Sequence, residues 1–461
     1  MTDHTPVPRW ARVLDVLCLL FSGIALIVAV SGGFRVRWLG VRIGVTSPAP
    51  LLIWAFLVGA VRHAIVRERP LYRQLPRQLA EWSRLTAVRT AAVVVVGTQP
   101  AMLFVGYLAV LMIGYAGGRA PLRHFTNELL NLPVRWDAGW YLQIVTEGYR
   151  YAPADPSLQQ NIVFFPAYPM LMRVVGRLLG GELTGYVLAG LLISFGAFFG
   201  ALIYLYSFAR DALGEDTARG AVWLLAAYPF ALFFGALYTE SLFLLGTIGA
   251  FHHFTQQQFG RASLWGVLVG LTRLNGALLS IPLLVLAVES MRRARPRAGT
   301  WAAVLAPGAG LAVYALFIWA KTGNPFTFFA GQIAWGRENQ GIGALVATQY
   351  SAIAHGGLTA YLGAPGYDAL NALGVIFVLA TVLPVTRRLG IAYGLFILVN
   401  VLPPLANGGL LSTGRFSAVL FPAFVWLASA LSPLQRVGWI ASFAALQAFN
   451  AMLFYTWRPL F

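Results

Sequence analysis

The sequence AAVVVVGTQPAMLFVGYLAVLMIGYA, residues 91–116, contains no charged side chain. It is long enough to cross a bilayer as a helix, which takes about 20 apolar residues for a hydrocarbon core of about 30 Å. Similar apolar stretches recur along the chain without the alternation typical of strands. Because only helices and closed barrels satisfy their backbone groups in lipid, the sequence predicts an all-α polytopic membrane protein.

The composition supports this class. The chain has 461 residues, of which 58% are hydrophobic and 11% are charged, and so little polar surface could not cover a soluble domain. The net charge of +17 raises the question of nucleic acid, but the basic residues lie mainly in loops between apolar runs. Loop arginines of this kind act as topology signals and contact lipid headgroups. We therefore expect the lipid bilayer, and no nucleic acid, as a partner.

Thirteen apolar ranges, some short or interrupted, are candidate spans. They are residues 13–31, 49–64, 91–116, 184–208, 218–233, 238–254, 262–275, 276–289, 300–320, 367–385, 390–405, 416–432 and 437–455. Seven arginines fall between residues 62 and 89, which predicts that this segment is cytoplasmic and that the loop after residue 116 is external.

Residues 262–289 are expected to form two short helices that meet near Thr272–Gly276. A single crossing would place the four arginines of segment 292–297 outside, whereas two helices keep them inside. A glycine beside Arg273 and Asn275 fits an irregular break, which membrane proteins tolerate where the backbone lines a cavity.

This topology predicts three regions and one external site. Residues 1–90 would form N-terminal transmembrane helices with a basic cytoplasmic segment. Residues 91–320 would form a core with an external loop, 117–183, that carries amphipathic helices, and residues 321–461 would add an external loop and the last helices. We expect a multi-pass protein of the plasma (inner) membrane whose polar motifs converge on the extracytoplasmic face.

The external loop contains a carboxylate among aromatic residues, in the sequence Arg135-Trp136-Asp137-Ala138-Gly139-Trp140-Tyr141. A carboxylate at a membrane face is costly unless it performs chemistry or binds a ligand. A short helix through residues 135–147 would put Asp137 and Tyr141 on one face, four positions apart. The plainer alternative is that Asp137 pairs with Arg135 or caps this helix.

Four motifs together resemble the PIG-V family, the second mannosyltransferase of GPI-anchor assembly, and its bacterial relatives. They are Arg135-Trp136-Asp137 with Tyr141, Phe164–Pro169, Tyr238–Phe243 and Thr272–Gly276. The resemblance covers about residues 130–290. Of the 33 basic residues, 32 are arginine, a bias typical of GC-rich bacterial coding. Two apolar spans precede the helix that leads into the Asp137 loop, which departs from the eukaryotic pattern, and a bacterium would lack the GPI acceptor.

The resemblance implies a GT-C-type inverting glycosyltransferase. The donor would be a polyprenyl-phosphate sugar, usually of mannose, and the acceptor a glycolipid, a glycan or a protein. Asp137 would be the general base that deprotonates the acceptor hydroxyl. Arg273 and Arg415 are candidates for binding the donor phosphate, because arginine is always charged and forks its donors. The plainer alternatives are a salt bridge from Arg273 to Glu240 and a snorkelling role for Arg415.

Further substrate-binding candidates surround these residues. Glu240 lies at a helix start, where an acid could contact the acceptor or simply favour the helix dipole. Tyr238 and Trp140 could stack on sugar or anchor the chain in the interface. The remaining candidates are Arg135, Trp136, Tyr141 and Asn275. No metal and no cofactor are expected, because no paired-ligand spacing appears outside and Cys18 is the single cysteine.

Three other functions stay open at this point. A transporter or flippase for lipid or polysaccharide would show intramembrane charges along a path and an internal inverted repeat, neither of which the sequence displays. Another lipid-linked transferase could use the same fold, since function resides in the site. A scaffold would have no need for an Asp, a Glu, two Arg and an Asn on one face.

Overall fold

The computed structural model describes residues 8–31, 34–38, 41–66, 70–118, 120, 122–152, 158–291, 297–337, 339–364, 368–407 and 409–460. Over these ranges the chain is helical except for loops and one antiparallel hairpin, β1 (Phe34–Trp38) and β2 (Val41–Val45), with Phe34 opposite Val45. Seven of the described helices are long and apolar enough to cross a membrane, and three more are apolar helices of 10–17 residues. The prediction of an all-α multi-pass membrane protein is confirmed. Each of the thirteen predicted ranges overlaps a helix, although the number of crossings stays a prediction.

The chain forms two compact units, residues 1–89 with 171–189 and residues 90–170 with 190–461. In the first unit, α1 (Arg9–Ser31) packs against α2 (Ala49–Ile65), and the hairpin β1–β2 connects them. Arg62 and Asp15 are both buried between these helices and pair at 2.8 Å, which compensates each charge in an apolar setting. Helix α3 (Leu71–Arg84) follows, and it contacts α1.

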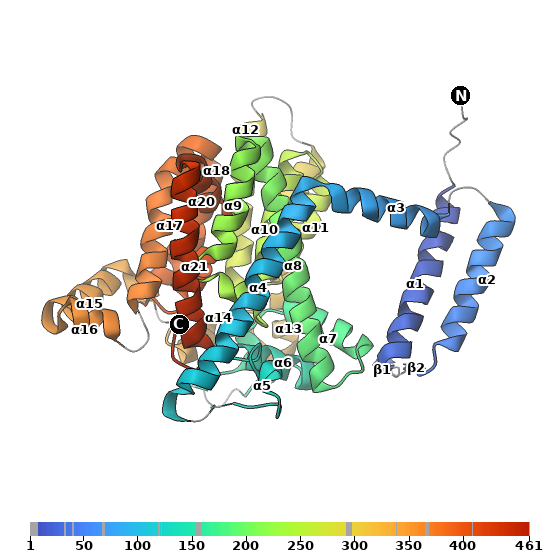
Figure 1. Ribbon diagram of the computed structural model, residues 1–461, viewed down its shortest axis with the longest axis horizontal. Coiled ribbons are helices and arrows are strands. Elements are labelled where there is room, and N and C mark those ends of the chain that lie inside the picture. Colours follow the sequence, from blue (N-terminus) through green and yellow to red (C-terminus); the bar gives the residue numbers. More distant parts are fainter. Residues whose placement is uncertain are drawn as a thin grey trace. The chain divides into compact units, whose positions relative to one another are not determined.

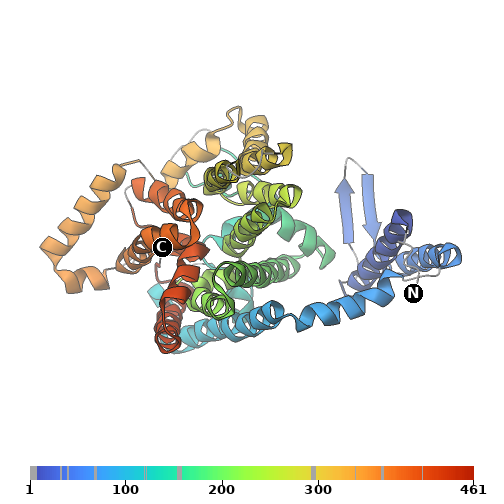
Figure 2. The same cartoon turned by 90° about the horizontal axis from the view of Figure 1, so that it is seen from above.

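The second unit contains most of the long helices. They are α4 (Thr86–Ile113), α8 (Leu183–Leu213), α9 (Glu215–Ala227), α10 (Glu240–Thr255), α11 (Phe259–Gly270), α12 (Ser280–Met291), α13 (Ala298–Thr322), α17 (Asp368–Leu389), α18 (Ile391–Ala406), α20 (Phe421–Ala430) and α21 (Pro433–Tyr455). The first residues of α4 (86–89) and of α8 (183–189) belong to the first unit. They run side by side in Figure 1 and are seen nearly end-on in Figure 2.

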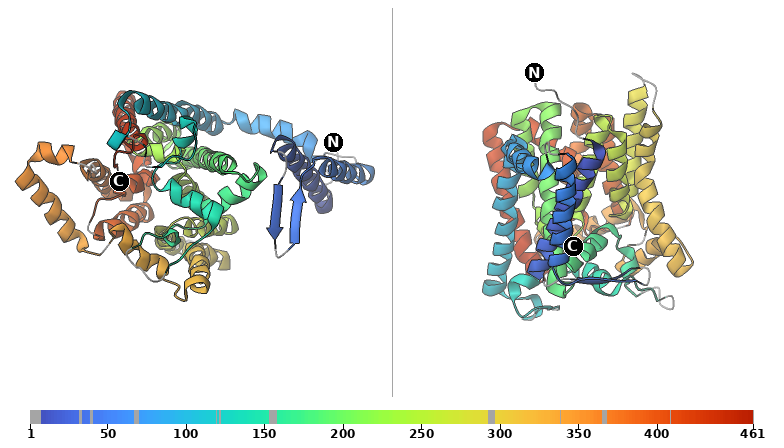
Figure 3. Two further views of the ribbon diagram at one scale, coloured as in Figure 1. Left: turned by 90° about the horizontal axis from the view of Figure 1, so that it is seen from below. Right: turned by 90° about the vertical axis from the view of Figure 1, so that its right-hand side faces the viewer.

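Short helices gather at one end of this bundle. They are α5 (Glu128–Asn131), α6 (Ala138–Glu147), η2 (Asn161–Val163), η3 (Ala231–Gly235), α14 (Thr327–Ala330), η5 (Gly331–Trp335) and α19 (Thr413–Ala418). Seen from below, the teal segment that includes α6 crosses the ends of the long helices (Figure 3). Two further helices, α15 (Gly341–Gly356) and α16 (Leu358–Gly363), follow η5. The predicted loop helices at 117–183 are therefore present, with α6 beginning at Ala138.

The predicted break near residues 272–276 is confirmed. Helix α11 ends at Gly270, the backbone is extended at Arg273 (φ −153°, ψ 154°), and the short helix η4 (Leu274–Leu279) leads into α12. Glycine is required here for close packing, because a Cβ at Gly276 would lie 2.1 Å from the carbonyl oxygen of Val269. The break directs the Arg273 side chain toward the end of the bundle where the short helices lie.

Candidate active site

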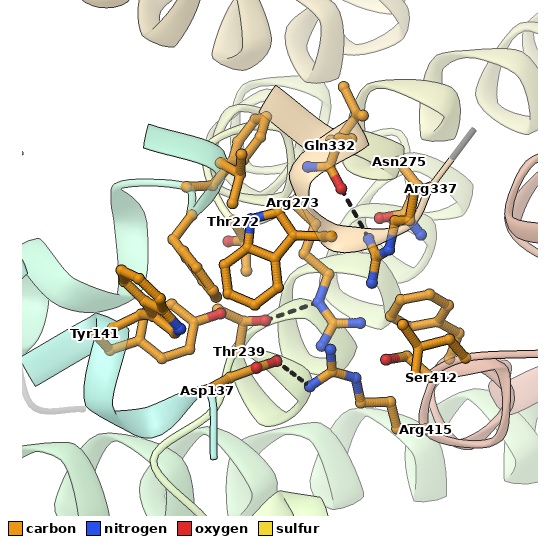
Figure 4. Close-up of a pocket in the computed structure, with 18 of the residues that line it drawn as sticks. Asp137, Tyr141, Thr239, Thr272, Arg273, Asn275, Gln332, Arg337, Ser412 and Arg415 are labelled. Atoms are coloured by element: carbon orange, nitrogen blue, oxygen red, sulfur yellow. Dashed lines mark hydrogen bonds and ion pairs between the residues drawn. The ribbon is translucent and has the colours of Figure 1, made fainter. Parts of the chain in front are cut away.

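A cavity of about 470 Å³ opens at this end of the second unit, and all its walls come from that unit. Its size is in the range of pockets that hold small organic ligands. It is lined by Trp136, Asp137, Trp140, Tyr141, Gln159, Val163, Phe164, Phe165, Thr239, Thr272, Arg273, Leu274, Asn275, Gln332, Trp335, Arg337, Leu411, Ser412, Arg415 and Phe416. Figure 4 shows the polar members of this set around the cavity. Segments that are up to 280 residues apart in sequence thus meet at one site, as the sequence analysis predicted.

Seven of the ten predicted site residues line the cavity, and three do not. The seven are Trp136, Asp137, Trp140, Tyr141, Arg273, Asn275 and Arg415. The other three, Arg135, Tyr238 and Glu240, are buried behind the wall, each with an exposed fraction of 1% or less. Their contacts, described next, fit positioning of the cavity residues better than contact with a substrate.

Asp137 follows a strained residue. Trp136 adopts a left-handed backbone (φ 55°), which is unfavourable for a bulky side chain and concentrates at functional sites. Tyr238 holds both sides of this turn: its hydroxyl accepts the backbone N–H of Asp137 at 3.1 Å and donates to the carbonyl of Arg135 at 3.2 Å. The Asp137 carboxylate is thereby directed into the cavity.

The end of α21 holds the same turn from the other side. The Trp136 indole donates to the carbonyl of Phe454 at 3.1 Å, and Arg135 Nε donates to the carbonyl of Tyr455 at 3.1 Å. The Trp136 and Trp457 rings lie 5.0 Å apart. Arg135 also pairs with Glu128, so the expected alternative of an Arg135–Asp137 pair is not what forms. The two residues point to opposite sides of the turn.

Asp137 pairs with Arg415 instead, at 2.7 Å between Oδ2 and Nη1 (Figure 4). Arg415 Nε also lies 3.9 Å from Glu240 Oε1. Arg415 is buried rather than snorkelling, because only 9% of its side chain is exposed. The cavity wall thus places a carboxylate against a cation that comes from α19, far along the chain.

Arg273 forms the second pair of the site. It contacts Glu240 at the start of α10, and its Nε donates to Thr239 Oγ1 at 2.7 Å. The salt bridge to Glu240 expected as the plainer alternative is therefore present, while the guanidinium still lines the cavity. Its Nη1 is buried and has no hydrogen-bond partner among the described residues.

A third arginine, Arg337, lines the cavity and was not predicted. Its guanidinium lies 5.8 Å from the centre of the Phe416 ring, which Arg273 and Arg415 also approach, at 5.5 and 5.6 Å. Burial, followed by the charge of Arg415, lowers the pKa of Arg337 to about 10. The only sequence signal was its place after Gln332 and Trp335 in a polar loop that was predicted to be external, which is not specific.

Aromatic rings form another part of the cavity lining. Trp140 stacks on Phe164 with ring centres 5.9 Å apart, and Trp335 meets both edge-on at 5.3 and 5.4 Å. The Trp335 indole N–H has no partner among the described residues. Such a wall presents flat apolar faces, which suit the apolar face of a sugar.

Metal ligands do not gather in the part of the chain that the structure describes, where no group of three His, Cys, Asp or Glu could hold an ion. The two carboxylates of the site, Asp137 and Glu240, both contact arginine. These contacts place a carboxylate of the cavity beside fixed positive charge.

The fold and this cavity define a multi-pass membrane protein with a charged, aromatic-walled site at one end of its helical bundle. Residues 120–291 match the family model described as Mannosyltransferase (PIG-V). The resemblance inferred from the four motifs is confirmed over this range, which contains Asp137, Glu240, Arg273 and Asn275.

Comparison with solved structures finds similarity to the oligosaccharyltransferase of Archaeoglobus fulgidus. A crystal structure of that enzyme with zinc and sulfate has 14% identity and a TM-score of 0.39, covering 76% of this chain and 53% of the other. The archaeal oligosaccharyltransferase AglB in complex with an inhibitory peptide and a dolichol-phosphate has 11% identity and a TM-score of 0.37, covering 79% and 56%. The chain thus spans little more than half the length of these proteins. No curated protein matches it.

Proposed function

We propose that the protein is a GT-C-type inverting glycosyltransferase of the plasma membrane. It transfers a hexose, for which the family favours mannose, from a polyprenyl-phosphate sugar to an extracytoplasmic glycolipid, glycan or protein. The observation that carries the proposal is the Asp137 carboxylate, which lines the cavity beside Arg415 and follows a strained turn that is held on both sides. A carboxylate so oriented is suited to act as a general base.

The transfer step requires two bonds to change at the anomeric carbon. The acceptor oxygen bonds to this carbon while its proton passes to Asp137. The bond from the carbon to the phosphate oxygen breaks on the opposite face, and its electron pair leaves with the polyprenyl phosphate. Attack from the face opposite the leaving group inverts the anomeric configuration.

The arginines supply the other requirement, stabilisation of the leaving phosphate. Negative charge develops there as the bond breaks, and fixed guanidinium donors stabilise such charge most where water is excluded. Arg415 pairs with Asp137 through Oδ2. This pair orients the carboxylate and leaves Oδ1 to accept the acceptor proton, while the guanidinium adds positive charge near the phosphate.

The cavity walls suit the rest of the donor. Trp140, Phe164 and Trp335 offer ring faces to the sugar, and Asn275 and Gln332 offer amides to its hydroxyls. The prenyl chain would remain in the bilayer, which is why the phosphate must be bound at the end of a helical bundle rather than in its middle.

The test is a transfer assay with the purified full chain, radiolabelled polyprenyl-phosphate mannose and membranes as acceptor source. The wild type should label a product whose identification gives the acceptor class. Asp137→Asn should lower the transfer rate about 1,000-fold, because general-base catalysis contributes about 10²–10⁴-fold, and should retain donor binding. Asp211→Asn, which changes an exposed carboxylate of α8, is the matched control and should transfer normally.

Turnover by Asp137→Asn at the wild-type rate would remove Asp137 as the base. Absence of transfer by the wild type with mannosyl, glucosyl and arabinosyl donors would overturn the glycosyltransferase proposal itself.

A further inference from the structure

Arg337 differs from the other two arginines of the cavity in the contact it makes. It follows η5 and Gly336, whose backbone is left-handed (φ 69°), and its Nη1 donates to Gln332 Oε1 at 3.1 Å. This partner is a neutral amide of the same short segment. In Figure 4 the guanidinium groups of Arg273, Arg337 and Arg415 point toward the same space.

Arg273 and Arg415 are already committed to carboxylates. Arg415 contacts Asp137 and Arg273 contacts Glu240, whereas Arg337 has no ion pair with any residue that the structure describes. Among the described residues of the site, three guanidinium groups therefore face two carboxylates, which leaves one positive charge in excess. The excess lies on Arg337.

The position of Arg337 is costly until an anion arrives. Its charge is half-buried and close to two like charges, which is why its pKa is lowered to about 10, by burial first and by Arg415 next. A bound anion would offset both effects, while a neutral sugar or alcohol would offset neither. The planar fork of arginine favours a phosphate, whose oxygens accept two parallel hydrogen bonds.

We propose that Arg337 is the principal counter-ion of the donor phosphate, with Arg273 and Arg415 retained mainly by the site's carboxylates. This inference rests on the proposed function, since the phosphate is that of the lipid-linked donor. Arg337 then determines donor affinity, while Arg415 chiefly orients the base. Loss of Arg337 should raise the KM for the donor and leave the KM for the acceptor unchanged.

The test measures binding of farnesyl phosphate, and of farnesol as its uncharged analogue, to the purified full chain in lipid nanodiscs. Arg337→Ala should weaken farnesyl phosphate binding about 10- to 100-fold, the range expected for a hydrogen-bonded charge, and leave farnesol binding unchanged. Arg337→Lys restores the charge without the fork and should recover part of the loss. The control is Arg150→Ala, which removes an arginine that is 66% exposed on the same unit. This variant should bind both probes normally.

Glu338, the next residue, lies outside the described residues. Glu338→Gln tests whether this neighbouring carboxylate affects farnesyl phosphate affinity. Affinity at or above that of the wild type supports the inference. A loss as large as that of Arg337→Ala would overturn it, because the segment rather than the charge would then be responsible. Equal loss of farnesol binding in Arg337→Ala, or a change in farnesyl phosphate affinity of less than twofold, would also overturn it.

The outcomes separate this inference from the proposed function. A wild type that transfers sugar while Arg337→Ala binds farnesyl phosphate normally rejects the role of Arg337 alone. A wild type that binds farnesyl phosphate through Arg337 but transfers no sugar rejects the enzyme proposal and keeps the phosphate site. A wild type that binds neither probe and transfers no sugar overturns both.

Discussion

Arg135 and Asp137 are separated by one residue, yet they belong to two different regions of the molecule. Arg135 is fully buried, pairs with Glu128 and donates to a carbonyl at the end of α21. Asp137 lines the cavity and pairs with Arg415 of α19. The difference shows that the Arg135–Glu128 pair, which does not line the cavity, holds the loop in place, while the Asp137–Arg415 pair on the cavity wall remains available to a ligand.

The residue between them makes this division possible. The left-handed backbone of Trp136 turns the chain so that its two neighbours point to opposite sides. Strain of this kind persists only where surrounding contacts hold it, and here Tyr238 and the carbonyl of Phe454 do so. The contacts that hold Arg135 and Trp136 thus also maintain the position of the Asp137 carboxylate.

The largest effect should come from the reactive pair. Arg415→Met leaves Asp137 without its cation and should lower the transfer rate about 100-fold, within the about 10²–10⁴-fold that general-base catalysis contributes. If Arg415 acts chiefly through Asp137, adding Asp137→Asn should lower the rate no further than Asp137→Asn alone, because residues of one unit are not additive. Steady-state rates of the two single variants and the double variant measure this.

Multiplicative losses in that double variant would contradict the coupling. They would mean that Arg415 binds the phosphate independently of the base.

The Arg135–Glu128 pair should affect stability rather than the transfer rate. Arg135→Met leaves Glu128 and a carbonyl without their donor, and breaking a buried pair costs about 3–5 kcal/mol of unfolding free energy. The rate per folded molecule should stay within about tenfold of wild type, because the changed side chain does not reach the cavity. Thermal unfolding in detergent, together with transfer normalised to folded protein, separates the two quantities.

Arg219→Met is the control for that variant, since it removes an exposed pair with Glu215, which contributes about 0–1 kcal/mol. A fully stable Arg135→Met protein that had lost transfer would contradict this assignment, because Arg135 would then contribute to transfer and not to stability.

The smallest effect should come from the Tyr238 hydroxyl, which hydrogen-bonds to the backbone of both Asp137 and Arg135. Tyr238→Phe removes one donor and one acceptor but keeps the ring, which costs about 1 kcal/mol of stability. The transfer rate should fall about fivefold to tenfold, because the Asp137 backbone is less well held. Transfer assays at saturating donor measure the change. An unchanged rate would show that α21 alone holds the turn.

The sequence predicted the spans well because long apolar runs have few alternatives. It also predicted the break at Arg273 from the positions of arginines on either side, and it brought Asp137, Arg273, Asn275 and Arg415 to one site. These residues have distinctive side chains at recognisable places between apolar runs. Each of these residues is recognisable from its neighbours in the sequence, and all four line the same cavity in the structure.

What escaped prediction depends on distant or nonspecific contacts. The carbonyls of Phe454 and Tyr455 lie 318 and 320 residues from their donors, and a backbone acceptor has no side-chain signature. Arg337 lies in a loop without periodicity, and loop arginines are common in this chain. A pair between Arg135 and Asp137 stayed open as an alternative, because the left-handed turn that separates them cannot be predicted from a tryptophan.

A structure of the Asp137→Asn protein with a polyprenyl-phosphate sugar bound would test the roles of Asp137 and Arg337 together. We expect the sugar to lie against Trp140 and Trp335 and the phosphate to lie within hydrogen-bond distance of Arg337. We also expect the substituted amide at position 137 to lie about 3 Å from the position of the attacking hydroxyl. A headgroup bound outside this cavity, or an amide at position 137 turned away from the anomeric carbon, would contradict these roles.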